Sequence, residues 1–260
     1  MRRISSRHHP IVRRFRALAS GPDAGAVLLD GEHLVAEALL AGVPIEAVLA
    51  DDQARLLADR AAAAGAEVFE APGAVVAAAR PVRAAGGIAA IARWSPASLT
   101  RVFDETRTFV VGLVDVQDPG NVGGAIRSSD ALGAGAVAAL GQSADPAGWK
   151  ALRGAMGSTF RIPVARGSVR DALAEAQKRG ALVVATVAEH GTPLDAADLT
   201  QPMLMLVGNE GAGLPEAAVS AAGRSVTIPM RAGVNSLNVA VTVAIVLWER
   251  RRQLAARRST

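Results

Sequence analysis

The 260-residue chain contains no cysteine and no tyrosine, and it has only five phenylalanines. The absence of cysteine excludes a disulfide framework and a thiolate metal site, and it fits a reducing compartment such as the cytoplasm, where we expect the protein to act. The four histidines are scattered along the sequence, so we expect no metal cofactor. With so few aromatic rings, base stacking on aromatic side chains cannot be the main mode of any nucleic-acid binding.

Long apolar runs are also missing. A membrane-spanning helix needs roughly 20 apolar residues, and the longest candidate, 239–248, is shorter and contains Thr242. The basic N-terminal segment lacks the apolar core of a signal peptide. It could pass for an organelle transit peptide, but its apolar spacing favours a folded helix. We therefore expect no membrane partner, and a hydrophobic content of 50% is enough for a substantial core.

Lysine is nearly absent, because only Lys150 and Lys178 occur among 28 basic residues. The net charge is +4, and arginine, which makes the better forked contact with phosphate, supplies almost all of the basic groups. Arginines cluster at both ends of the sequence, and the first sixteen residues contain no acid. RNA contact is the favoured interpretation of these clusters. A solvated charged surface, or the arginine bias of GC-rich coding, is the alternative.

Helix and strand patterns alternate along the sequence, which predicts an α/β protein with two units. The first unit, 1–93, combines an opening helix over 8–19 with short strands and further helices, and 94–107 is a polar linker. The second unit, 108–260, has strands of consecutive apolar residues, as expected for a parallel sheet covered by helices on both faces. Such a sheet binds its ligand at the carboxyl ends of the strands.

The first of three unusual loops, 115–133, follows a predicted strand. Its turn at 118–121 leads into a helix, with Asn121 as the expected N-cap and Arg127 almost two turns further on. Amide groups at a helix start favour an anion. An ordinary capped helix with an exposed arginine is an equally good interpretation of this loop alone.

The second loop, 206–214, contains three glycines within six residues and one acid, Glu210. Glycine permits close approach of the backbone to a ligand. The spacing Gly-x-x-Gly-x-Gly differs from the dinucleotide fingerprint, and no P-loop lysine follows it. A tight strand-to-helix turn is the alternative interpretation.

The third loop lies within 226–241, where we expect a strand to end at Pro229 and Ser236 to cap the last helix, with Asn238 in its first turn. A polar start to an otherwise apolar helix suggests a binding site near that N-terminus, and a plain cap is the alternative. The apolar face of this helix is expected to contain Leu237, Val241, Ile245 and Trp248.

Taken together, the stretches DPGNVGGAIRSSDALG, GNEGAGL and IPMRAGVNSLNVAV resemble, in order and spacing, the three motifs of the SpoU/TrmH family in the SPOUT superfamily of methyltransferases. Residues 150–164 resemble the segment between the first two motifs, and 1–93 resemble the small ribosomal-protein-like RNA-binding domain that precedes many members. The resemblance implies a C-terminal α/β trefoil knot, a homodimer, and methyl transfer from S-adenosylmethionine to a ribose 2′-hydroxyl of structured RNA. Ribosomal RNA is the favoured substrate and transfer RNA the alternative.

The resemblance also implies roles for individual residues. The polar site positions of the family correspond to Asn121, Arg127, Glu210, Ser236 and Asn238. The cofactor positions correspond to Thr186, Leu206, Gly208, Ile228 and Leu237. The family's proposed catalytic residue, sometimes assigned as the base, corresponds to Arg127. Because a guanidinium does not readily lose its proton, a fork on the target phosphate that also stabilises the developing alkoxide is the more economical role.

Two positions depart from the family pattern, namely Ala232, where glycine is common, and Asn235, where an acid is common. Two other classes fit part of the sequence. A non-catalytic RNA-binding protein with the same fold is disfavoured by the intact polar positions. A nucleotide-dependent oxidoreductase is disfavoured by the missing dinucleotide fingerprint. Within the methyltransferases, methylation of a base is the remaining alternative.

Overall fold

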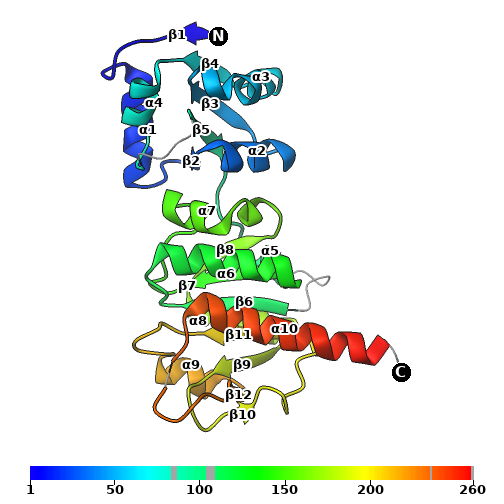
Figure 1. Cartoon of the computed structure of the whole chain (residues 1–260). Helices are drawn as coiled ribbons and strands as arrows, with labels where there is room; N and C mark the ends of the chain where they lie inside the picture. Colours follow the sequence, from blue (N-terminus) through cyan, green and yellow to red (C-terminus); the bar gives the residue numbers. More distant parts are fainter. Residues whose placement is uncertain (83–86, 104–108, 235, 259–260) are drawn as a thin grey trace. The chain divides into compact units, whose positions relative to one another are not determined.

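The computed structural model shows two compact units, each built around its own sheet (Figure 1). The residues that it describes are 1–82, 87–103, 109–234 and 236–258. The first unit consists of Met1–Ser95 and Ala147–Arg161, and the second of Pro96–Pro146 and Ile162–Thr260. Among the described residues, no helix has the length and apolar character needed to span a bilayer.

The sheet of the first unit has five strands in the order β1-β4-β3-β5-β2. Their bounds are β1 Arg2–Arg3, β2 Ala26–Asp30, β3 Ile45–Ala50, β4 Glu67–Glu70 and β5 Ile88–Arg93. The surrounding helices are α1 Pro10–Ser20, α2 Glu32–Leu40, α3 Arg55–Ala63, α4 Gly73–Ala79 and α7 Trp149–Ala155. Successive residues of β2 point to opposite faces, so Val27 and Leu29 pack with α2 and α3 while Leu28 packs with α1 and α4. Helices cover both faces, which explains why β2, β3 and β5 are mostly apolar and buried.

The segment Ala147–Arg161 belongs to the first unit although it lies between two strands of the second. Its helix α7 packs on β2, and Leu152 joins the core there. The fully buried carboxylate of Asp30 forms ion pairs with Arg80 and with Arg153 of α7, at 3.4 Å for the latter. Two arginines offset the cost of burying this charge. The predicted division, with 1–93 as the first unit and 108–260 as the second, assigns this segment to the second unit. A local sequence pattern does not show on which sheet a helix packs.

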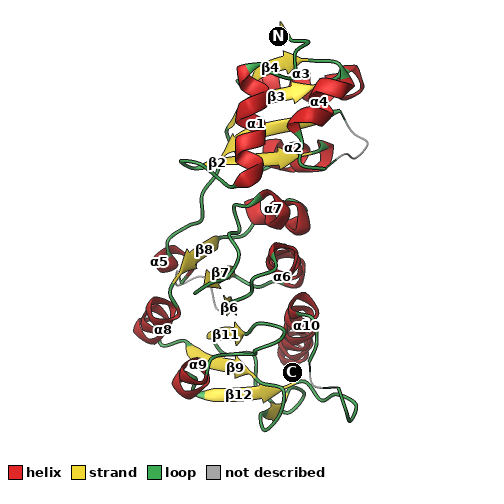
Figure 2. Cartoon of the chain, turned by 90° about the vertical axis from the view of Figure 1, so that its left-hand side faces the viewer, coloured by secondary structure: helices red, strands yellow, loops and turns green. Residues whose placement is uncertain are grey.

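The sheet of the second unit has seven strands in the order β10-β12-β9-β11-β6-β7-β8, and all its pairings are parallel. The strands are β6 Phe109–Val114, β7 Ala136–Leu140, β8 Val164–Gly167, β9 Leu182–Thr186, β10 Thr192–Pro193, β11 Met203–Val207 and β12 Arg224–Thr227. The helices are α5 Leu99–Val102, α6 Pro119–Leu132, α8 Val169–Lys178, α9 Glu216–Ala221 and α10 Val239–Arg258. All residues of β6 and β11 are buried. The predicted parallel sheet with helices on both faces is thus confirmed (Figure 2), whereas the knot stays a prediction.

Part of the expected polar linker is folded. Residues 99–102 form α5, and Val102 and Phe103 lie in the core of the second unit. The remainder of the linker, 104–107, lies outside the described residues.

The residues predicted for the apolar face of the last helix are not the ones that pack on the sheet. The residues of α10 that are buried are Val239, Val243, Val246, Leu247 and Arg250. By contrast, Val241 and Trp248 are exposed, at 45% and 62%. The helix begins with ten almost uniformly apolar residues, so spacing alone does not decide which side faces the sheet.

Candidate functional site

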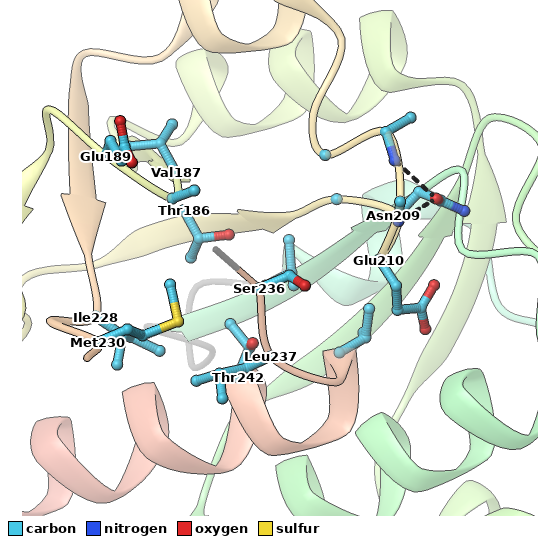
Figure 3. A pocket seen from close by; sticks show the side chains of 17 residues that line it. Thr186, Val187, Glu189, Asn209, Glu210, Ile228, Met230, Ser236, Leu237 and Thr242 are labelled. Atoms are coloured by element: carbon cyan, nitrogen blue, oxygen red, sulfur yellow. Dashed lines mark hydrogen bonds between the residues drawn. The ribbon is translucent and has the colours of Figure 1, made fainter. Parts of the chain in front are cut away.

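A pocket of about 490 Å³ lies at the carboxyl ends of β9, β11 and β12 (Figure 3). The turns after these strands and the start of α10 form its walls. This position agrees with the expected ligand site of a parallel sheet, and the volume lies in the range of small-molecule sites. Among the described residues that line the pocket there are two carboxylates, Glu189 and Glu210, and no basic side chain. The lining therefore favours a neutral or cationic ligand over an anionic one.

The glycine-rich turn after β11 is shaped by its own hydrogen bonds. Asn209 Oδ1 accepts from the backbone N–H groups of 211–212, at 2.8 and 3.1 Å, and the backbone groups of Asn209 and Gly213 bond to each other. Gly213 has a φ of +70°, and a Cβ on Gly208 would lie 2.3 Å from the carbonyl carbon of Gly213. A side chain at position 208 would clash with Gly213, and the φ of Gly213 favours glycine, so the two glycines allow the turn beside the pocket to close tightly.

The sequence reasoning missed Asn209 and Asp115, which connect the first two loops. Asn209 Nδ2 donates to the carbonyl oxygen of Asp115 at 3.1 Å. Asp115, directly after β6, has a φ of +55°, and its carboxylate accepts from the backbone N–H of Gln142 at 2.7 Å. A non-glycine residue in this region is uncommon. Asn followed by Glu-Gly, with one residue between it and the end of a strand, is a signal for an Asx turn and could have identified Asn209.

Three polar residues from three distant segments form one hydrogen-bonded set, which we call the amide relay: Asn238, Asn121 and Glu210. Asn238 Oδ1 accepts from the N–H groups of Ala240 and Val241, at 2.9 and 3.3 Å, and so caps α10. Its Nδ2 donates to Asn121 Oδ1 at 2.7 Å, and Asn121 Nδ2 donates to the carboxylate of Glu210. Because the cap uses the oxygen of Asn238, the direction of every donor in the amide relay is fixed.

Two predicted helix caps are wrong. The N-cap of α6 is Asp118, whose carboxylate accepts from the N–H of Asn121 at 3.2 Å. Pro119 takes the first helical position, which suits a residue without an N–H, so Asn121 falls within the first turn. Likewise Asn238 caps α10, and Ser236 lies before the helix, where it lines the pocket.

The five residues predicted for the polar site positions are only partly brought together. Glu210 and Ser236 line the pocket, and the amide relay extends from Glu210. Arg127 is exposed on α6 outside the pocket lining, and its side chain makes no hydrogen bond or ion pair with the described residues. Of the two departures from the family pattern, Ala232 is exposed and Asn235 lies outside the described residues.

Four of the five predicted cofactor residues line the pocket, and these are Thr186, Gly208, Ile228 and Leu237. The fifth, Leu206, is buried in β11, and its carbonyl oxygen accepts from Thr186 Oγ1 at 3.0 Å. Lining residues that the sequence reasoning did not assign to the site include Glu189, Met230 and Thr242. The first two lie within three residues of a strand end, where the rule for parallel sheets would have directed attention.

Comparison with known proteins places this geometry in a family. Residues 108–248 match the SpoU rRNA Methylase family. The 23S rRNA (guanosine(2553)-2′-O)-methyltransferase RlmP of Bacillus subtilis is 30% identical over 254 residues, which cover 96% of this chain and 100% of that protein.

Two solved structures are similar over almost the whole chain. The AdoMet-bound rRNA methyltransferase from Sinorhizobium meliloti has a TM-score of 0.87 and 30% identity, and the match covers 97% of this chain and 98% of that one. The SpoU methyltransferase AviRb from Streptomyces viridochromogenes, in complex with AdoMet, has a TM-score of 0.82 and 29% identity, with 95% and 100% covered. Since the family match spans more than half of the sequence and the Bacillus relative aligns over its full length, this chain belongs to the SpoU rRNA methylase family.

Proposed function

We propose that the protein transfers a methyl group from S-adenosylmethionine to a ribose 2′-hydroxyl of ribosomal RNA. The observation that carries this proposal is the pocket at the ends of β9, β11 and β12, joined through Glu210 to the amide relay. The relatives support it, because RlmP is a 23S rRNA 2′-O-methyltransferase and two structural neighbours are methyltransferases with AdoMet bound.

The pocket suits S-adenosylmethionine in size, backbone and charge. Its volume of about 490 Å³ is that of a small-molecule site, and Gly208 and Gly213 contribute backbone without side chains to its lining. Two carboxylates without a basic neighbour in the lining suit a sulfonium cation. When bound, this cofactor supplies a methyl group that is already activated. The residues proposed to hold it are Thr186, Gly208, Ile228 and Leu237, with Leu206 behind Thr186.

The chain must place the 2′-oxygen and help its proton to leave. Placement of two reactants alone can remove about 7–11 kcal/mol of barrier. We assign this placement to Ser236 at the pocket edge and to the amide relay, whose donors have one fixed direction. Glu210 is the acceptor end of the relay, which positions its carboxylate beside the pocket.

Arg127 is proposed to hold the target phosphate and stabilise the developing alkoxide. It is exposed and without a partner among the described residues, so its fork is available to RNA. Arg127→Ala is expected to keep S-adenosylmethionine affinity and to lower methyl transfer by about 10²–10³-fold. Calorimetry and transfer of labelled methyl to a ribosomal RNA fragment measure the two effects. Arg224→Ala, an exposed arginine of β12, is the matched control, and wild-type turnover of Arg127→Ala would refute the role.

The substrate is tested by mapping 2′-O-methylated nucleotides in RNA from cells with and without the protein. Loss of methylation at a ribosomal nucleotide, restored by the wild-type protein, is the expected result. Loss at a transfer RNA position instead would assign the enzyme to that substrate. If no methylation changes and the purified protein does not bind S-adenosylmethionine, the proposed function is rejected.

We further propose that RNA contacts the first unit. We also propose that the protein acts in the cytoplasm. Several N-terminal arginines are already engaged, since Arg2, Arg3 and Arg14 pair with carboxylates of β3 and β4. Arg7 and Arg13 are exposed and make no side-chain hydrogen bond or ion pair with any described residue. These two arginines are therefore the better candidates for phosphate contact.

We also propose that the protein is a homodimer. On the outer side of α10, Val241 and Trp248 are exposed and Ile245 is half-buried, and their spacings of four and three place the three residues in one stripe. We call these three residues the α10 stripe. A large aromatic side chain left in water at the end of an apolar stripe is typical of an interface anchor.

A further inference from the structure

One carboxylate of the pocket takes no part in the amide relay. Glu189 lines the pocket in the turn after β9, and Figure 3 shows it on the opposite side from Glu210. Its side chain is 75% exposed, and among the described residues its one close contact with a basic side chain is with the imidazole of His190, at 3.8 Å. The carboxylate of Glu189 is therefore free to accept hydrogen bonds from a bound ligand.

The turn that carries Glu189 is held in place on both sides. Val187 and Gly191 each donate a backbone N–H to β12 at 2.9 Å, the latter to Thr227 Oγ1. A Cβ on Gly191 would lie 2.5 Å from Thr227 Oγ1, so the turn is as close to β12 as glycine allows. His190 has a φ of +62°, in the left-handed region that non-glycine residues rarely adopt. Glu189 is thus presented by a fixed backbone at the mouth of the pocket.

The two strands that lead to these turns are neighbours. β9 pairs in parallel with β11, so the turn with Glu189 and the glycine-rich turn lie at the same edge of the sheet. Parallel sheets that bind dinucleotides use a comparable pair of turns, although the glycine spacing differs here. A glycine-rich turn after one strand allows close approach, and a carboxylate after a neighbouring strand accepts from the ribose hydroxyls. A vicinal diol offers two donors, which match the two oxygens of a carboxylate.

We propose that Glu189 binds the ribose diol of the nucleoside part of the ligand, an inference that rests on the proposed function. The geometry gives the two acids of the pocket separate tasks. Glu210 is bonded to Asn121 and belongs to the side where the methyl acceptor is proposed to bind. Glu189 accepts hydrogen bonds from the cofactor on the other side of the pocket.

The test compares ligands with and without the diol. Calorimetry measures the affinity of the full-length protein for 5′-methylthioadenosine and for its 2′,3′-dideoxy counterpart. The wild type is expected to bind 5′-methylthioadenosine with at least about tenfold higher affinity than the dideoxy compound, because a hydrogen bond to a charged group contributes about that much. Glu189→Ala is expected to prefer the diol by less than about twofold, and Glu189→Gln to fall between. Glu216→Ala, an exposed acid of α9 outside the pocket lining, keeps the wild-type preference.

Each alternative outcome is decisive. A Glu189→Ala variant that prefers the diol as strongly as the wild type overturns the assignment. A variant that loses affinity for S-adenosylmethionine but not for 5′-methylthioadenosine places the carboxylate on the methionine ammonium, which also overturns it. A wild type that binds neither ligand contradicts the proposed function itself. Thermal unfolding of each variant confirms that it is folded, as expected for a change at an exposed side chain.

Discussion

At the scale of single residues, Asn238 combines two functions that substitution can separate. Its oxygen caps α10, and its amino group donates to Asn121. Asn238→Asp keeps a good N-cap and adds a charge that the helix N-terminus favours. It removes the donor, however, and sets a carboxylate against Asn121 Oδ1. Thermal stability is therefore expected to be unchanged or higher, while methyl transfer falls about 10–100-fold, as measured by unfolding curves and labelled methyl incorporation.

The matched variant is Asn238→Ala, which removes both functions. It is expected to lose about 1 kcal/mol of stability, the usual cost of a missing cap, together with activity. If Asn238→Asp methylates RNA at the wild-type rate, the amide relay is a structural feature with no part in the reaction.

The sequence motifs predicted residues that the structure brings together, but not the hydrogen bonds between them. Asn121, Glu210 and Asn238 are identified by the order of three motifs, and they do form one hydrogen-bonded set. Their partners could not be predicted, because Asn121 and Glu210 are 89 positions apart. Asn209 went unnoticed for a similar reason, since its amide bonds to Asp115 of another loop.

At the scale of elements, Asp198 connects the loop before β11 to the end of α10. It accepts from the hydroxyl of Thr200 at 2.6 Å and pairs with Arg257 at 3.2 Å. The hydrogen bonds from Thr200, with a smaller contribution from the charge of Arg257, lower the pKa of Asp198 from 3.8 to about 2. A depressed carboxyl pKa stabilises the folded state above the unfolded pKa, and this stabilisation is lost as the pH falls through the folded value.

The expected result is a stability difference confined to one pH range. Asp198→Asn is expected to unfold at a lower temperature than the wild type at pH 6, and the two curves are expected to converge as the pH falls from about 4 to about 2. Thermal unfolding followed by circular dichroism across this range measures the difference. Asp59→Asn, an exposed acid of α3, serves as control and follows the wild type. A gap between Asp198→Asn and the wild type that is constant with pH would contradict the linkage.

The element boundaries show where a local pattern is sufficient. The uniformly apolar strands predict a sheet buried on both faces, and β6 and β11 are fully buried. The face of α10 was not predictable, because an apolar run on all sides of a helix gives no preferred direction. Packing against α6 and the sheet decides it, and Val241 and Trp248 remain outside.

At the scale of the whole molecule, the alternating pattern predicts two units, but it does not predict which segments belong to each unit. The segment Ala147–Arg161 leaves the second sheet after β7, packs on the first unit, and returns to form β8. Its anchors are the ion pair of Arg153 with Asp30 and that of Arg161 with Glu37. These partners are more than a hundred positions apart, and no spacing rule connects them.

The α10 stripe makes the assembly state testable. Trp248 is 62% exposed at its end, and aromatic anchors of this kind often cost 2 kcal/mol or more when removed from an interface. Trp248→Glu is therefore expected to weaken a dimer by at least about 30-fold, measured by sedimentation at micromolar concentration. Leu56→Glu, which changes a residue of α3 that is 78% exposed, should leave the dimer intact.

Trp248→Glu is also expected to affect activity. Because α10 also begins at the pocket, a dimer through this helix would place the second subunit near Asn238, so monomeric Trp248→Glu should lose methyl transfer as well. A wild type that sediments as a monomer, or a Trp248→Glu variant that stays dimeric, would show that the stripe serves another purpose.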